Sequence, residues 1–169
     1  IKAHDDLFHT SDVPLYLISA PGRTEIIGNH TDHNNGRVLA AAVNLDCLAC
    51  VSPRQDMIVR IQSQGYPGIE LSLEDLSVHP EEEGTSAALV RGVAKGMADH
   101  GYKLGGFDAA VTSDVMGGSG LSSSAAYEVM VCAILDKLYN GFVVDAVLRA
   151  QIAQYAENVY FGKPSGLMD

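Results

Sequence analysis

The sequence predicts an α+β fold, because segments with strand character fill the first part of the chain and helical periodicity fills the second. Short apolar or alternating segments bounded by turn residues occupy about residues 14–73. Apolar residues recur at helical spacing over 86–100, 123–138 and 145–160. Strands followed by helices suit a layered α+β architecture.

Four strands are expected before the first long helix. Residues 14–20 form a short apolar strand that should end at the breaker Pro21-Gly22. A long apolar run follows over 38–51, interrupted by the polar residues Asn44 and Asp46. Residues 57–62 alternate, which indicates a half-buried strand, and 69–73 is a further candidate.

Three helices and one strand complete the prediction. The first helix spans about 86–100 and should be closed by Gly101 as a C-cap, after an acidic loop at 80–84. A strand at 107–112 leads into a glycine-rich turn and a strong helix at 123–138. The third helix spans 145–160.

Length and charge restrict the classes of function. The chain has 169 residues, 47% of them hydrophobic and 19% charged, which is typical of one folded domain. The net charge of −10 argues against nonspecific binding to nucleic acid or to an anionic membrane. It does not argue against a nucleotide held by backbone amides and a metal ion.

No segment has the length of a membrane span and no signal peptide opens the chain. Since the chain starts at Ile1 and stops at Asp169, we expect a fragment of a longer protein.

The cysteines are expected to be structural. Cys47 and Cys50 form a C-x-x-C within an apolar strand, where residues three apart point to opposite faces. A buried, reduced pair is therefore favoured over a redox or zinc site, and Cys132 belongs to an apolar helix. Free thiols predict a reducing, cytoplasmic location.

The glycine-serine segment at about 114–126 is a candidate phosphate site. Its glycines permit positive φ and close approach of backbone N–H groups to a ligand, and a helix N-terminus follows. The alternative is a capped helix after a flexible turn. The segment fits neither the Walker pattern nor the Rossmann pattern.

Two more polar constellations are candidates for ligand binding. Within residues 20–36, Arg23, His30 and Asp32 suit a polyhydroxylated ligand, although a polar loop between strands would look similar. Near the C-terminus, Glu157 and Asp169 add two carboxylates. Taken alone, they are better explained as a solvated helix residue and a loop residue.

The glycine-serine segment resembles the second motif of the GHMP kinases. The resemblance implies that the loop wraps the phosphates of ATP and that Ser124 helps to hold Mg²⁺. The phosphate-binding residues implied are Gly117, Gly118, Ser119, Gly120, Leu121, Ser122, Ser123 and Ser124.

The segment at 20–36 resembles the galactokinase signature G-R-x-N-x-x-G-E-H-x-D. The resemblance implies that Arg23 is catalytic and binds substrate, and that His30 and Asp32 line the sugar site. Two positions depart from the pattern: Glu25 stands where Asn is usual, and Asn29 stands where Glu is usual. Galactose stays the favoured substrate, with the exact sugar left open by Asn29.

The C-terminal segment at 156–169 resembles the galactokinase run A-E-[HN]-x-x-x-G-x-P-C-G-I-M-D, with Ser165 in place of Cys. The resemblance places Glu157 near Mg²⁺ and Asp169, beside the substrate-binding Gly166, at the anomeric hydroxyl of the sugar. Arg23 and Asp169 are then the catalytic pair. Because three ordered segments match, the resemblance extends over essentially the whole chain.

The resemblance implies a fold and an activity. The fold is the GHMP kinase N-terminal domain over 1–169, related to ribosomal protein S5 domain 2, with a mixed sheet and helices packed on one face. The activity is ATP-dependent phosphorylation of galactose at O1. Alternatives are a GHMP kinase for arabinose, N-acetylgalactosamine or a non-sugar alcohol, a non-catalytic sugar and ATP sensor, and a bare interaction domain. We expect the C-terminal GHMP domain to be absent, the isolated fragment to be nearly inactive, and its exposed inter-domain face to favour dimerisation.

Overall fold

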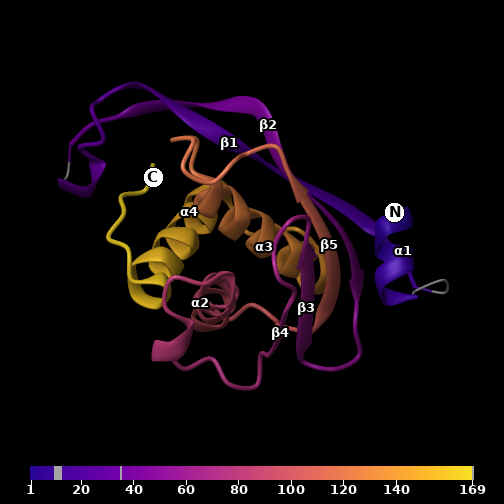
Figure 1. The fold of residues 1–169 in the computed structure, drawn as a ribbon. Helices are drawn as coiled ribbons and strands as arrows, with labels where there is room; N and C mark the ends of the chain where they lie inside the picture. Colours follow the sequence, from indigo (N-terminus) through magenta and orange to yellow (C-terminus); the bar gives the residue numbers. More distant parts are fainter. Residues whose placement is uncertain (10–12, 35, 169) are drawn as a thin grey trace.

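The strands form one mixed five-stranded sheet in the computed structural model, which describes residues 1–9, 13–34 and 36–168, apart from the side chain of His33 (Figure 1). The order across the sheet is β1-β2-β5-β3-β4. Neighbours are antiparallel except for β3 and β5, which are parallel. The strands are β1 Tyr16–Ile27, β2 Leu39–Pro53, β3 Ile58–Ser63, β4 Ile69–Ser72 and β5 Phe107–Ser113.

The long helices cover one face of the sheet, as predicted (Figure 1). They are α2 Ser86–Asp99, α3 Ser123–Tyr139 and α4 Ala146–Tyr155. The core follows from strand alternation: Cys47, Ala49 and Val51 of β2 face the helices and are buried, whereas Leu48 between them is exposed. Short turns of 3-10 helix occur at η1 Asp32–Asn34 and η2 Pro80–Glu82.

Strand β1 is longer than the sequence predicts, and the expected end at Pro21-Gly22 is wrong. Proline is tolerated because β1 is an edge strand, where one side needs no backbone donor. The pairing with β2 shifts register between Pro21 and Arg23 and then continues to Ile27. The β1–β2 hairpin therefore extends beyond the rest of the sheet and carries Arg23 over the start of α3 (Figure 1).

The third predicted helix is divided in two. Asp145 caps α4 by accepting hydrogen bonds from the amides of Val147 and Leu148. After Tyr155 the chain changes to the π-helical segment η3 Ala156–Phe161, which ends at Gly162 with φ 82°. Wide turns of this kind interrupt a helix and are frequent at functional sites. Glu157 lies in η3, so its placement depends on this change.

A short N-terminal helix, α1 Lys2–Phe8, packs against the other face of the sheet and is absent from the sequence prediction. Its His4 is fully buried, and His4 Nε2 lies 3.3 Å from both the Asp108 carbonyl oxygen and Ser52 Oγ. Nearby, the buried Asp108 carboxylate accepts hydrogen bonds from Arg54 and Arg60. Seven residues are too few for apolar periodicity to be decisive.

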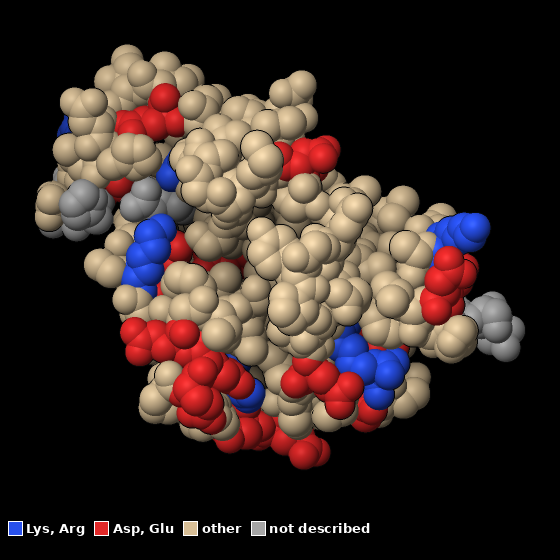
Figure 2. Space-filling model, in the orientation of Figure 1, with Lys and Arg blue, Asp and Glu red and all other residues tan. Residues whose placement is uncertain are grey.

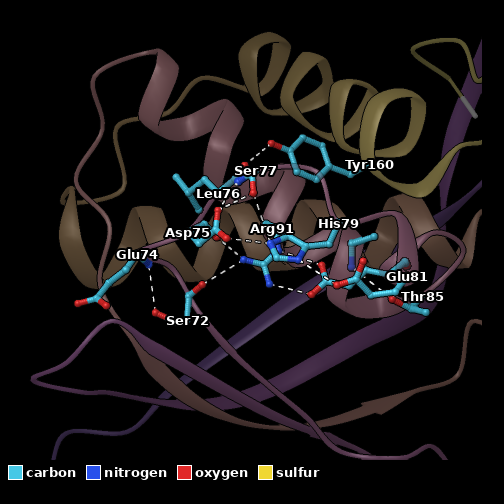
Figure 3. Close-up of polar contacts among 12 residues, drawn as sticks. Ser72, Glu74, Asp75, Leu76, Ser77, His79, Glu81, Thr85, Arg91 and Tyr160 are labelled. Atoms are coloured by element: carbon cyan, nitrogen blue, oxygen red, sulfur yellow. Dashed lines mark hydrogen bonds and ion pairs between the residues drawn. The ribbon is translucent and has the colours of Figure 1, made fainter.

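Arg91 of α2 joins the helices to the segment after β4 (Figure 3). Its buried guanidinium makes two hydrogen bonds to the Glu82 carboxylate, at 2.9 and 2.7 Å, and also donates to the carbonyl oxygens of Ser72 and Asp75. Tyr160 of η3 donates to the Leu76 carbonyl oxygen at 2.5 Å. These bonds fix η3, and hence Glu157, against the rest of the domain.

Surface charge and cysteine placement agree with the sequence prediction. Acidic side chains gather along the lower edge of the molecule, below α2, in the view of Figure 2. The three cysteines are buried and free. In the described part of the chain, no helix has the length and apolar character needed to cross a membrane.

Candidate functional site

The glycine-serine loop connects β5 to α3 and presents an open backbone. Gly118 and Gly120 have φ of 77° and 75°, and a side chain at either position would meet open space. Ser122, the N-cap of α3, adopts a left-handed conformation and makes no side-chain capping bond. The amides at this end of α3 therefore point to a position where an anion can bind. Ser119 is the exception within the loop, since its hydroxyl donates to the Met116 carbonyl oxygen at 2.6 Å.

Arg23 joins this loop to the C-terminal segment. Its Nε donates to the Met168 carbonyl oxygen at 2.6 Å, and its NH1 donates to the Gly120 carbonyl oxygen at 2.9 Å. The Arg23 amide also bonds to the Leu121 carbonyl oxygen. The neighbouring Gly22 allows this approach, because a Cβ there would lie 3.0 Å from that same oxygen. One residue of the β1–β2 hairpin thus contacts two other predicted motifs.

Asp32 fixes the C-terminal segment from the other side. Its Oδ2 accepts a hydrogen bond from the Met168 amide at 2.9 Å. Its Oδ1 is buried and has no hydrogen-bond partner among the described residues. The neighbouring Gly166 is buried. Asp169, the predicted catalytic carboxylate, lies outside the described residues, one position beyond Met168. Asp32 therefore offers a free acceptor close to the end of this segment.

Ser124 and Glu157 lie together, as expected of two ligands of one cation. The Ser124 hydroxyl donates to Oε1 of Glu157 at 2.7 Å, and Lys163 Nζ lies 3.1 Å from the same oxygen. Glu157 is 1% exposed. Hydroxyl and carboxylate oxygens are the ligand types that Mg²⁺ prefers. The donor set fits a magnesium ion.

Glu128 is a buried acid that the sequence interpretation missed. It lies one helical turn after Ser124, is 1% exposed, and both of its carboxylate oxygens lack a partner among the described residues. Burial, reinforced by the charge of Glu157, raises the pKa of Glu128 to about 9. The available signal was that Glu128 is the one charged residue within 125–135, four positions after Ser124.

Asn29 and His30 lie in a turn at the end of β1. Gly28, Asn29 and His30 have φ of 135°, 55° and 51°. The His30 amide donates to both carboxylate oxygens of Glu25 at 3.1 Å, and His30 Nε2 lies 3.2 Å from Oε2. Asn29 and His30 are exposed, so both are accessible to a ligand.

Two cavities flank the first turns of α3. One, of about 300 Å³, is bordered by Arg23, Glu128, Glu157 and Met168. The other, of about 500 Å³, is bordered by Tyr66, Met116, Gly117, Tyr127 and Phe161. The Tyr127 hydroxyl is buried without a partner among the described residues. Both cavities border the first turns of α3 and have the size of small ligands.

Two family models match the chain. The galactokinase galactose-binding signature matches residues 2–53, and the GHMP kinases N-terminal domain matches residues 86–169. The chain belongs to the GHMP kinase family. The resemblance inferred from its motifs and the predicted fold are confirmed.

Several galactokinases are similar to this GHMP kinase chain. It is 36% identical to a galactokinase of Clostridium tetani over 151 residues, which is 89% of this chain and 38% of the relative. It is 39% identical to a galactokinase of Streptomyces coelicolor over 158 residues, 92% of this chain and 40% of the relative. The chain thus spans about two fifths of the length of the curated relatives it matches.

Solved structures show the same fold. Lactococcus lactis galactokinase complexed with galactose superposes with a TM-score of 0.90 at 28% identity, covering 99% of this chain and 43% of that one. Methanococcus jannaschii mevalonate kinase superposes with a TM-score of 0.74 at 18% identity, covering 92% and 50%.

Proposed function

We propose that the protein containing this chain transfers the γ-phosphoryl group of ATP to O1 of galactose. One observation carries the proposal: the Arg23 guanidinium contacts both the glycine-serine loop and the segment that ends at Asp169. A phosphate cradle and a sugar pocket must meet at one point for direct transfer. The names of the relatives and the galactose bound in the Lactococcus lactis structure support the same assignment.

The glycine-serine loop supplies the phosphate side. Backbone amides of residues 117–124 bind the phosphates, where they act together with the positive end of the α3 dipole. The cavity of about 500 Å³ beside the loop receives the nucleoside, with the Tyr127 hydroxyl as an unused hydrogen-bonding group. The loop needs no lysine of its own because its charge complement comes from the backbone, Arg23 and a cation.

Ser124 and Glu157 would hold Mg²⁺, which neutralises charge on the β- and γ-phosphates when it is bound. The Glu157 carboxylate is paired with Ser124 and Lys163. These contacts keep the carboxylate oriented toward the first turn of α3 in advance.

The β1–β2 hairpin and the C-terminal segment supply the sugar side. Oδ1 of Asp32 accepts a sugar hydroxyl, since it is buried and unpartnered while Oδ2 holds the Met168 amide. Asn29, His30 and Gly166 border the same ligand. Asp169 takes the O1 proton or orients that hydroxyl as O1 attacks the γ-phosphorus and ADP leaves. Arg23 keeps Asp169 ionised and stabilises the transferring charge. The buried free cysteines support a reducing compartment, which we propose is the cytoplasm.

A related sugar is the second candidate substrate, because Glu25 and Asn29 depart from the usual galactokinase signature. Release of ADP by the full-length protein, measured with ATP, Mg²⁺ and a panel comprising galactose, arabinose and N-acetylgalactosamine, separates the two. We expect the highest kcat/KM with galactose. Asp169→Asn should lower kcat at least a hundredfold, with Asp99→Asn, at an exposed carboxylate of α2 that pairs with Lys95, as the matched control. Equal activity of Asp169→Asn would remove Asp169 from the mechanism, and turnover of another sugar alone would replace galactose.

A further inference from the structure

The turn at Gly28–His30 is an unusual piece of backbone. Three successive residues have φ of 135°, 55° and 51°, and only the first is glycine. Positive φ costs free energy for residues with a Cβ, although Asn and His tolerate it better than most. Such a turn persists only if other contacts hold it, and these contacts decide where the Asn29 and His30 side chains lie.

The Glu25 carboxylate binds this turn at His30. Its two carboxylate oxygens each lie 3.1 Å from the His30 amide nitrogen, and Oε2 lies 3.2 Å from His30 Nε2. The Glu25 side chain is 11% exposed, whereas that of His30 is 52% exposed. A second bond, from Thr31 Oγ1 to the Gly28 carbonyl oxygen at 2.8 Å, closes the turn locally. The carboxylate of a strand residue therefore fixes both the backbone and the imidazole of His30.

The position of this carboxylate explains the two departures from the galactokinase signature. That signature has an amide at position 25 and an acid at position 29, and this chain has the reverse. The contact between Glu25 and His30 shows that position 25 reaches the residue directly after position 29. The acid therefore stands four residues earlier in this chain than in the signature, and its carboxylate still reaches the same turn.

We infer that Glu25 and Asn29 are a coupled pair that determines sugar specificity, in which Glu25 supplies the charge and positions His30 while Asn29 supplies an amide to the ligand. The inference rests on the proposed function, because it assigns the turn to the sugar site. Glu25 acts through His30 and is a positioning residue. Its loss should weaken sugar binding and leave nucleotide binding unchanged.

The test is a mutant cycle in the full-length protein: Glu25→Asn, Asn29→Glu and the double exchange. With galactose and ATP as substrates, Glu25→Asn should raise the KM for galactose about tenfold, because the turn loses its carboxylate. Asn29→Glu alone should also raise it, because the turn that already binds the Glu25 carboxylate then carries a second one. The double exchange should return the KM for galactose to within about threefold of the original. The KM for ATP should change less than twofold throughout.

A fourth variant, Glu25→Gln, separates charge from shape. It keeps an acceptor for the His30 amide but removes the charge, so its KM for galactose should rise like that of Glu25→Asn. Additive effects in the cycle, an unchanged Glu25→Gln variant, or parallel rises in both KM values would overturn the inference. If the unmodified protein phosphorylates another sugar of the panel instead, the proposed substrate fails, and the same cycle measured with that sugar still decides the coupling.

Discussion

The Ser124 hydroxyl and the Glu157 carboxylate are joined by a hydrogen bond of 2.7 Å between the first turn of α3 and the π-helical segment η3. Two oxygen groups from segments 33 residues apart thus meet beside the glycine-serine loop. If both hold the cation, removing either should raise the Mg²⁺ concentration that gives half-maximal activity by about 10- to 100-fold. Ser124→Ala, Glu157→Gln and their combination test this by Mg²⁺ titration and by Mn²⁺ binding without nucleotide. Expressed as free energy of Mg²⁺ binding, the loss in the double variant should be smaller than the sum of the losses in the two single variants.

Ser119→Ala is the matched control, since the Ser119 hydroxyl bonds within the loop to Met116. Its Mg²⁺ requirement should stay within twofold of the original. A Ser124→Ala variant that binds Mn²⁺ as well as Ser119→Ala does would exclude Ser124 as a ligand.

Glu128 should make the domain less stable as the pH rises. Its folded pKa of about 9 lies above the ordinary value of 4.5, so between these values the folded protein keeps a proton that the unfolded chain releases. The free energy of unfolding then falls with rising pH, by at most about 1.4 kcal/mol per unit. Glu128→Gln removes this dependence. We expect urea unfolding at pH 6 and pH 8, without Mg²⁺, to show a higher free energy of unfolding for Glu128→Gln, relative to the original protein, at pH 8 than at pH 6. An unchanged difference at the two pH values would contradict the prediction.

Asp108 should be important for stability. Its carboxylate is buried and accepts hydrogen bonds from Arg54 and Arg60, the shortest of which is 2.6 Å, from Arg60 Nε. Asp108→Asn removes the carboxylate paired with Arg60 and leaves Arg54 with Asp56 alone, and we expect a loss of about 2 kcal/mol in the free energy of unfolding, discounted for the partial exposure of both arginines. Asp56→Asn is the control: Asp56 also contacts Arg54 but is exposed, and its substitution should cost less in the same urea titration. Equal losses would show that burial of Asp108 contributes nothing.

Gly92 of α2 should not tolerate a side chain. A Cβ there would lie 2.8 Å from both Cα and Cβ of Ala156. Gly→Ala ordinarily stabilises a helix interior by about 0.5–1 kcal/mol, but here the backbones of α2 and η3 must separate, at a cost of about 1–3 kcal/mol. Gly96→Ala is the milder comparison, since its nearest contact is Ile152 Cγ2 at 3.0 Å. In thermal unfolding, Gly92→Ala should have a lower midpoint temperature than Gly96→Ala. The reverse order would refute the close contact between Gly92 and Ala156.

The sequence predicted the strands and long helices well where periodicity or turn residues were strong. The strand at 107–112 and the helix at 123–138 differ from β5 and α3 by one residue at their ends. Tertiary context decided the rest. Pro21 could be placed inside a strand only by knowing that β1 lies at the edge, and the π-helical turn at Glu157 has no local signal that we can identify.

The site was predictable as a set of motifs but not as an arrangement. Arg23, Asp32, Ser124 and Glu157 were singled out by residue type and resemblance. In the structure, Arg23 and Asp32 each bond to the backbone of Met168, and Ser124 bonds to Glu157. The role of Glu25 was not predictable, because its partner is the backbone of a left-handed turn. Glu128 was overlooked because it falls within an apolar helix, where no motif marks it.

Both backbone polar groups of Met168 are bonded by side chains of the β1–β2 hairpin, the carbonyl oxygen by Arg23 and the amide by Asp32, which are 145 and 136 residues earlier. Contacts across such long loops are entropically late, so this junction should close near the end of folding, after the sheet and helices have formed.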